Sequence, residues 1–246
     1  MAQFVHDGSF DGLLCALATA LRNGTTPEGL AAEDQRQTLL FCDEVQVRTD
    51  PAVAREMAGR IRDKISRQAF RNTLHVHLSE LPDLGLPLFD YIREGLARGE
   101  CIDRWHAHAS VRAVHEAAQK TTREIHRFKG LLRFRELADG TLWAPVEPDH
   151  QIILPLALHF SMRLSLERGI IHDLRRGTAV AWVEGSVRYL APPTPSGLPL
   201  AGHERDIQRL WQTYIRSGTI AERANAHIKK RCMPVRYWKW LTEKAA

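Results

Sequence analysis

The stretch RFKGLLRFRELADGTLWAPV, residues 127–146, predicts the fold of the second half of the chain. In residues 127–135, a period of two places Phe128, Leu132 and Phe134 on one face and the basic residues on the other, which is typical of a β-strand. Asp139-Gly140 is a strong hairpin signal, and residues 142–146 form the returning strand, where Pro145 indicates an edge or a bulge. We therefore expect an antiparallel hairpin. The basic face of its first strand consists of Arg127, Lys129, Arg133 and Arg135.

The segments after this hairpin predict more strands and one helix. Apolar spacing favours a helix from Ile152 to about Leu166, followed by extended segments near residues 169–173, 179–182 and 187–190. This part of the chain is expected to be a small, mainly antiparallel sheet with one packed helix, and a helical tail follows it.

The segments before the hairpin predict helices and two short strands. Residues 3–6 are extended, and Ser9 is the expected N-cap of a helix that ends at Gly24. Residues 44–49 alternate like a strand. Residues 101–125 contain no Gly or Pro and predict one long helix. The predicted fold class is therefore α+β, with an α-rich N-terminal half.

Composition divides the chain into four regions. Residues 1–122 form the α-rich N-terminal region, and residues 123–191 form the antiparallel α+β region. Residues 192–202 are the expected linker, because four prolines within residues 191–199 cannot enter a helix or a central strand. Residues 203–246 are the basic C-terminal helices.

The overall composition is that of an ordinary globular protein. The chain has 246 residues, of which 44% are hydrophobic and 26% are charged, and this excludes an intrinsically disordered protein. No apolar run approaches the roughly 18 residues of a membrane span, and the first residues do not resemble a signal peptide. The four cysteines are widely spaced, which favours reduced and mostly buried thiols. A cytoplasmic location is expected.

Charge is distributed unevenly along the chain. Residues 1–118 contain 13 Lys+Arg against 17 Asp+Glu, whereas residues 119–246 contain 21 against 12. Basic side chains near the C-terminus alternate with aromatic ones, a combination typical of proteins that bind single-stranded nucleic acid. The alternative is a solvated basic helix whose aromatic side chains pack on the sheet. The candidate residues of the tail are Lys229, Lys230, Arg231, Arg236, Tyr237, Trp238 and Lys239.

Four residues near the predicted hairpin could carry chemistry. If the two strands pair around Asp139-Gly140, residues 126–129 and residues 147–150 lie together at the end of the hairpin away from the turn. Two imidazoles and two carboxylates would then converge for acid–base work or to hold a divalent ion. The alternative is a salt-bridged strand end. The candidate catalytic residues are His126, Glu147, Asp149 and His150.

No cofactor and no metal site is predicted from the sequence. The chain lacks a glycine-rich nucleotide loop and a cluster of cysteines. The closest histidine pairs, His75 with His77 and His106 with His108, are two residues apart and lack further ligands nearby.

Five segments together resemble the bacterial "probable DNA metabolism protein" family: residues 6–16, 123–136, 147–150, 210–215 and 233–243. The C-terminal part of that family is similar to a domain of unknown function. In relatives, this domain is encoded beside a radical-SAM protein of DNA repair or modification, or fused to a uracil-DNA glycosylase-like domain. The chain departs from the family at His6, where an aromatic residue is usual, and at residues 173–177. The resemblance implies a setting in DNA metabolism and implies no catalytic residue.

Three functions are compatible with these patterns. The first is a DNA-binding accessory factor that presents single-stranded or damaged DNA to a radical-SAM partner through the basic strand face and the tail. The second is an enzyme that acts on nucleic acid through the four candidate catalytic residues. The third is a scaffold whose basic half docks on an acidic surface of the partner protein. The first is the function we expect.

Overall fold

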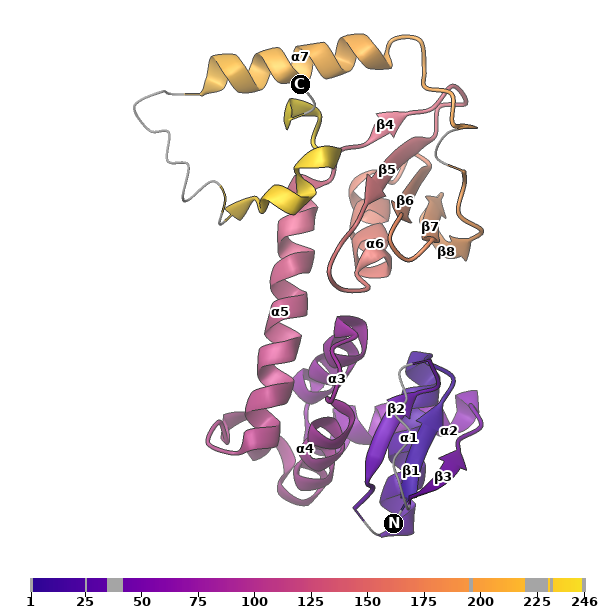
Figure 1. Ribbon diagram of the computed structural model, residues 1–246, viewed down its shortest axis with the longest axis vertical. Helices are drawn as coiled ribbons and strands as arrows, with labels where there is room; N and C mark the ends of the chain where they lie inside the picture. The colour runs from indigo at the N-terminus through magenta and orange to yellow at the C-terminus, as the bar shows by residue number, and fades with distance from the viewer. Residues whose placement is uncertain are drawn as a thin grey trace. The chain divides into compact units, whose positions relative to one another are not determined.

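The computed structural model describes residues 2–24, 26–34, 42–194, 197–219, 230 and 232–244. They form two compact units, Met1–Thr122 (unit 1) and Arg123–Ala246 (unit 2). Unit 1 contains a small parallel sheet and unit 2 contains a five-stranded mixed sheet, and helices dominate the described chain (Figure 1). The α+β fold class predicted from the sequence is confirmed.

The sheet of unit 1 has the order β2-β1-β3, and its strands are all parallel. The strands are β1 (Ala2–His6), β2 (Gly29–Ala32) and β3 (Asp43–Gln46), and α1 (Phe10–Asn23) connects the first two. Both predicted ends of α1 are confirmed. The Ser9 hydroxyl accepts a hydrogen bond from the Gly12 amide, and Gly24 adopts the left-handed conformation with φ 68°. The Asp7 carboxylate lies beside the start of α1, where it accepts hydrogen bonds from the Ser9 amide and hydroxyl.

The described residues between β3 and α5 form five helical segments. They are α2 (Pro51–Arg60), which continues as the π-helix η1 (Ile61–Ile65), α3 (Arg67–Ser79), α4 (Gly85–Arg98) and the 3-10 helix η2 (Gly99–Arg104). The apolar stripe of α2 and η1 faces the core, where Met57, Ile61 and Ile65 are buried. Of the four cysteines, only Cys15 is buried, so the expectation of mostly buried thiols is wrong.

His77 on α3 makes the stability of unit 1 depend on pH. Its ring lies 5.4 Å from that of Phe10, and burial, together with the nearby charge of His6, lowers its pKa to about 4. An imidazole in the unfolded chain has a pKa of about 6.5, so the unfolded state takes up the proton first as the pH falls. Unit 1 should therefore lose about 2 kcal/mol of unfolding free energy from about pH 7.5 to about pH 5 through this residue.

Urea denaturation followed by hydrogen exchange of the α1 amides would measure this loss. His77→Phe should remove most of this loss of unfolding free energy. His203→Gln, which replaces an exposed imidazole, should leave the loss unchanged. Because burial also lowers the pKa of His6 and His75, a smaller slope of the same sign should remain in His77→Phe. An unchanged slope in His77→Phe would contradict the assignment.

The sheet of unit 2 has the order β4-β5-β6-β7-β8. The strands are β4 (Arg135–Glu136), β5 (Leu142–Val146), β6 (Gly169–Asp173), β7 (Thr178–Val183) and β8 (Ser186–Leu190). Only β5 and β6 pair in parallel, and α6 (Ile153–Arg163) connects them and packs against the sheet (Figure 1). The core contains Phe128, Leu156 and Trp182. A Cβ atom at Gly169 would lie 2.2 Å from the Trp182 ring, so this position requires glycine.

The long helix predicted for residues 101–125 is displaced along the chain. A turn at residues 105–108 follows η2, and the helix α5 runs from Ala109 to Leu131. Its first part belongs to unit 1, and its last nine residues belong to unit 2.

The strand predicted for residues 127–135 is therefore wrong. Arg127 and Lys129 lie on α5, and only Arg135 lies in a strand. Phe128 and Leu132 are both buried, as predicted. Their burial does not distinguish the two structures, because residues four apart share a face in a helix as well as in a strand. The hairpin at Asp139-Gly140 is confirmed, with Gly140 at φ 81° and two residue pairs between β4 and β5. Pro145 lies beyond those pairs and is opposite His172 of β6 on the other side of β5.

The C-terminal part follows the proline-rich segment. The backbone near its end pairs with the hairpin, through the Ala138 amide and the Pro199 carbonyl. The elements are α7 (Glu204–Gly218) and the 3-10 helices η5 (Val235–Trp240) and η6 (Thr242–Lys244), both drawn in yellow in Figure 1. Of the predicted C-terminal helices in residues 203–246, the part at residues 220–229 and 231 lies outside the described residues. In the part of the chain that the structure describes, no helix combines the length and apolarity of a membrane span.

Candidate nucleic-acid interface

Helix α5 places one carboxylate, that of Glu124, inside unit 2. Glu124 accepts hydrogen bonds from the backbone amides of Asp149 (2.8 Å) and His150 (2.9 Å) and from the Tyr237 hydroxyl (2.5 Å). Only 3% of Glu124 is exposed to solvent. This cluster, which we call the Glu124 cluster, joins the loop of residues 147–150 to the C-terminal segment.

Sequence analysis missed Glu124, although its pattern contains a signal. Glu124 lies three residues after the buried Thr121 and four before the buried Phe128, so it occupies the core-facing stripe of α5. A carboxylate at such a position needs hydrogen-bond donors, because burying a charge without partners is costly. The donors come from segments 25 and 113 residues away.

Tyr237 remains a hydrogen-bond donor in the Glu124 cluster. Its ring is buried and meets the Phe128 ring edge-on at 4.7 Å. Burial, followed by the hydrogen bond and the charge of Glu124, raises the pKa of Tyr237 above its ordinary value. The phenol therefore keeps its proton at neutral pH and donates it toward the carboxylate.

Two exposed ion pairs lie beside this cluster. Arg236 contacts the carboxylate of Asp149, and Lys239 contacts the carboxylate of Glu147. The side chains of Arg236 and Lys239 are 53% and 52% exposed. The two groups of residues that the sequence predicted are therefore in contact here. The carboxylates are candidate acid–base residues, and the cations are candidate phosphate ligands.

Arginines from the turn after β6 also hold the loop of residues 147–150. Arg175 and Arg176 each donate a hydrogen bond to the Asp149 carbonyl (2.9 Å), and Arg176 also donates one to the Pro148 carbonyl (3.1 Å). Arg176 is in turn paired with the fully buried Asp173 at 2.7 Å. The loop is therefore positioned from both sides. These arginines lie in the stretch where the chain departs from the family it resembles.

The structure places the four candidate catalytic residues as follows. Glu147, Asp149 and His150 lie in one loop, and Glu147 and Asp149 are engaged in the ion pairs with the tail. His126 is exposed on α5, two residues after Glu124 and therefore about 200° around the helix from it. The predicted strand pairing that was to join them does not occur, because α5 extends through His126. An acid–base role for these residues stays a prediction.

Two of the predicted phosphate ligands have structural partners. Arg133 forms two hydrogen bonds to the Glu243 carboxylate (2.7 and 3.1 Å) and stacks on Trp211 at 5.0 Å. Arg135 lies 5.9 Å from the Trp143 ring centre, and burial lowers its pKa. Both side chains thus join elements within unit 2.

The other predicted ligands differ in exposure. The Trp238 indole donates to the Met233 carbonyl (2.9 Å), and the Lys244 ammonium lies over its ring at 4.4 Å. Lys230 is exposed, whereas Lys229 and Arg231 lie outside the described residues.

A second group of cations comes from Lys129 on α5 and Arg163 on α6, which both act on His159. Burial, and then the charges of Lys129 and Arg163, lower the pKa of His159. Lys129 and Arg163 are exposed, and no carboxylate contributes to the pKa shift of His159. Sequence analysis identified Lys129 but missed His159 and Arg163, because it treated residues 152–166 only as a packing helix.

Comparison with known proteins places the chain in a family. No curated protein matches it. Residues 82–243 match the family described as a domain of unknown function, DUF4130. The match extends over more than half of the chain and includes the whole Glu124 cluster. The chain therefore belongs to the DUF4130 family.

Proposed function

We propose that the chain is a DNA-binding accessory protein of bacterial DNA repair or modification, which acts in the cytoplasm beside a radical-SAM partner. Unit 2 supplies the binding surface. It contains 20 Lys+Arg against 12 Asp+Glu, whereas unit 1 contains 14 against 17. The DNA setting and the partner follow from the family resemblance, and the charge of unit 2 supports a polyanionic ligand.

The observation that carries the proposal is the exposed pairing of Arg236 and Lys239 with carboxylates. Ion pairs this exposed are worth at most about 1 kcal/mol each. A nucleic-acid phosphate can therefore replace the carboxylates of Asp149 and Glu147 at little cost. Tyr237, held by Glu124, fixes the backbone between the two cations. The cations are thus positioned before DNA binds, and this reduces the ordering cost of binding.

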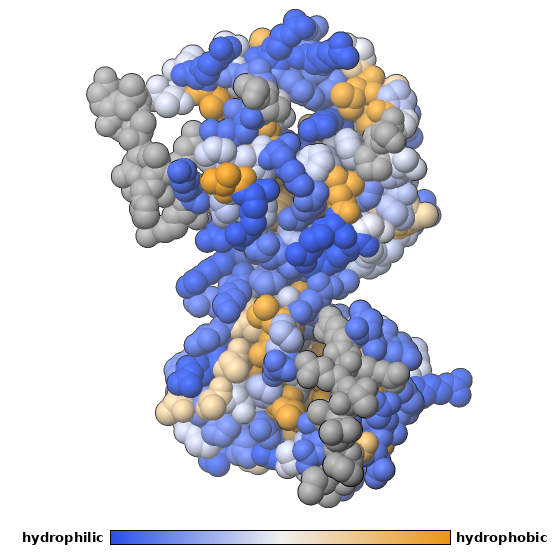
Figure 2. Space-filling model, viewed as in Figure 1, coloured by the Kyte–Doolittle hydropathy of each residue, from blue (hydrophilic) through white to orange (hydrophobic). Residues whose placement is uncertain are grey.

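The group of Lys129, His159 and Arg163 provides a second anchoring point within unit 2. Burial lowers the pKa of His159, and the charges of Lys129 and Arg163 add to that effect, so both cations act on the same imidazole. An anion bound beside that imidazole would be attracted by both charges. Figure 2 shows that hydrophilic residues cover most of the visible described surface of unit 2, with apolar side chains in separate patches.

Salt dependence tests whether phosphates are the ligand. For four phosphate contacts, affinity for single-stranded DNA should fall roughly 50-fold between about 50 and 200 mM salt. Fluorescence anisotropy with a labelled oligonucleotide of about 20 nucleotides measures it. Binding that is absent or insensitive to salt would overturn the proposal. Co-purification with a protein partner after nuclease treatment would then favour the scaffold function.

Paired substitutions test where the phosphates bind. Lys129→Gln with Arg163→Gln should weaken DNA binding about five-fold and reduce the salt slope. Arg205→Gln with Arg216→Gln removes the same charge from exposed positions of α7 and should change affinity less than two-fold. Equal losses in the two double variants would show that net charge alone, and not this group, determines binding.

A further inference from the structure

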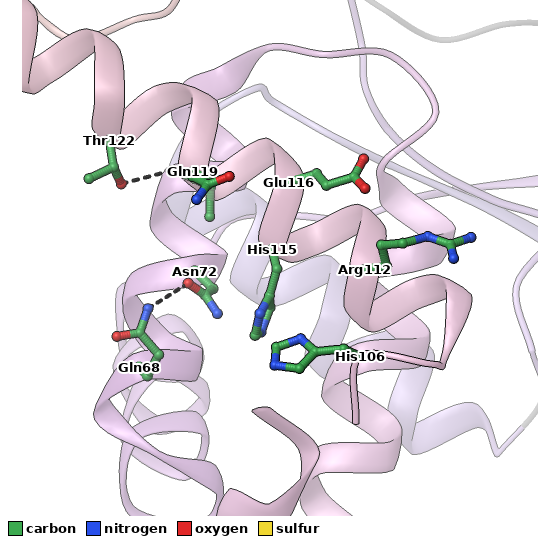
Figure 3. Close-up of a pocket in the computed structure, with 9 residues that line it drawn as sticks. Gln68, Asn72, His106, Arg112, His115, Glu116, Gln119 and Thr122 are labelled. Carbon is green, nitrogen blue, oxygen red and sulfur yellow. Dashed lines mark hydrogen bonds between the residues drawn. The ribbon is translucent and has the colours of Figure 1, made fainter. Parts of the chain in front are cut away.

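The polar pocket of unit 1 does not favour a charged ligand. It lies between α3, α5 and the turn at residues 105–108, and has a volume of about 460 Å³. Arg112 and Glu116 of its lining are one turn apart on α5 and extend to the same side of the helix (Figure 3). Their opposite charges offset each other. The exposed apolar side chains of α6, in unit 2, form a more specific feature.

Helix α6 is apolar on its outer side as well as on the side that packs against the sheet. Ile153, Leu156 and Phe160 are buried in the core of unit 2. Leu158 and Met162, however, are 49% and 76% exposed. A helix at a protein surface normally carries polar side chains on its outer side, and a helix that is apolar all round is normally covered. The exposed apolar residues of α6 therefore indicate a surface that a ligand covers.

The exposed apolar side chains lie on α6 and in the turn that follows it. Leu158 and Met162 are four residues apart, so they lie on the same side of the helix. Leu166 lies in the following turn, where the Glu167 amide donates a hydrogen bond to the Leu164 carbonyl (3.1 Å). The exposed fraction of Leu166, 97%, is the highest among the large apolar residues of the described chain. We call Leu158, Met162 and Leu166 the α6 apolar group.

Positive groups lie beside the α6 apolar group. His159 and Arg163 each follow one of its helical members by one residue, so they form the neighbouring row, about 100° around the helix. Burial, and then the charges of Lys129 and Arg163, lower the pKa of His159, which places Lys129 near the same row. The sequence of α6, ILPLALHFSMR, contains no Asp or Glu. A ligand that offers apolar surface together with negative charge therefore fits this arrangement.

The size of the α6 apolar group favours a nucleic acid over a protein as this ligand. A stable protein interface takes about 20 to 30 residues a side, and the group has three. Proteins that bend or open DNA insert a few apolar side chains, among them Leu and Met, between neighbouring bases. The bases offer apolar faces, and the phosphates beside them carry the negative charge. DNA therefore matches both the apolar group and the positive row.

We propose that Met162 and Leu166 insert between stacked bases of bound DNA, while Lys129 and Arg163 hold the adjacent phosphates. This inference rests on the DNA binding proposed above, and it names the preferred DNA as a duplex with a mismatched base pair. Insertion requires neighbouring bases to unstack, and this costs least where a pair is already weakened. At a matched pair the cost of unstacking offsets the gain from burying the two side chains, whereas at a mismatch the burial is a net gain.

Binding to two duplexes that differ in one base pair tests the proposal. Fluorescence anisotropy of the full chain should give roughly ten-fold higher affinity for a duplex with a central A·C mismatch than for the matched duplex. Met162→Gln with Leu166→Gln should reduce this preference to less than two-fold, and should leave the salt dependence unchanged because both cations remain. The control is Leu210→Gln with Tyr214→Gln on α7, which should keep the preference. All four side chains are more than half exposed, so both variants should fold.

A fluorescent base analogue reports the insertion directly. Pyrrolocytosine beside the mismatch becomes brighter when it unstacks, so its signal should rise with the unsubstituted protein and stay low with saturating Met162→Gln, Leu166→Gln protein. Equal affinity for the two duplexes, or a preference that survives this double substitution, would overturn the inference and leave the proposed DNA binding standing. Absence of salt-dependent binding to any DNA would overturn both. Loss of a protein partner in the double variant, with DNA binding unchanged, would show that α6 docks on protein instead.

Discussion

Replacing Glu124 with glutamine should lower the free energy of unfolding of unit 2 by about 3 kcal/mol. The carboxylate accepts two backbone amides and one phenol while it is almost fully buried. Hydrogen bonds to an ionised acceptor are about twice as strong as neutral ones. Glutamine has nearly the same volume but turns one acceptor into a donor, which would then face the amide of Asp149 or His150.

The loss can be followed by the fluorescence of tryptophan during urea denaturation, since five of the six tryptophans lie in unit 2. Tyr237→Phe removes only the phenol and should cost about 1 kcal/mol. In the double variant Glu124→Gln, Tyr237→Phe, the two losses should not add. Both substitutions affect the same hydrogen bond, from the Tyr237 hydroxyl to the Glu124 carboxylate. Glu136→Gln, which affects a half-exposed carboxylate paired with His203, is the matched control. A loss in Glu124→Gln no larger than in this control would contradict the assignment.

Local signals in the sequence predicted several elements correctly. Ser9 and Gly24 mark the ends of α1 because an N-cap side chain and a left-handed glycine act within a few residues. The hairpin at Asp139-Gly140 forms for the same reason. Each of these features depends on neighbours in the sequence, so one chain is enough to identify them.

Elements that depend on partners could not be predicted in this way. The strand β2 contains the sequence GLAA, which has no alternating pattern, and it forms because it pairs with β1. Residues 127–131 are helical because Ile125 and Phe128 lie on the core-facing side of α5, and the buried Leu132 directly follows its last residue. Phe128 and Leu132 alone fit either period. The local pattern fits a helix and a strand equally well, and tertiary packing determines that these residues form a helix.

The candidate site shows the same division. Sequence patterns identified both the loop of residues 147–150 and the basic tail, but not that they bind each other. Their connection runs through Glu124, whose partners Asp149 and Tyr237 are distant along the chain.

Neutralising Glu147 and Asp149 together should raise the affinity of the chain for single-stranded DNA roughly ten-fold. In the free protein these carboxylates pair with Lys239 and Arg236, so a phosphate must displace them. Glu147→Gln with Asp149→Asn removes that competition and leaves both cations in place. The Glu124 cluster should persist, because Glu124 bonds the backbone amide of Asp149 and not its side chain.

Two features separate this mechanism from a general change of charge. Because the unsubstituted protein already contacts both phosphates after they displace the carboxylates, the slope of log affinity against log salt should stay unchanged in this variant. Glu167→Gln with Glu184→Gln removes the same charge from exposed positions of unit 2 and should raise affinity less than two-fold. Adding Arg236→Gln and Lys239→Gln to the Glu147→Gln, Asp149→Asn protein should abolish the gain. If the control pair raises affinity as much as Glu147→Gln with Asp149→Asn does, the carboxylates do not compete with DNA for these two cations.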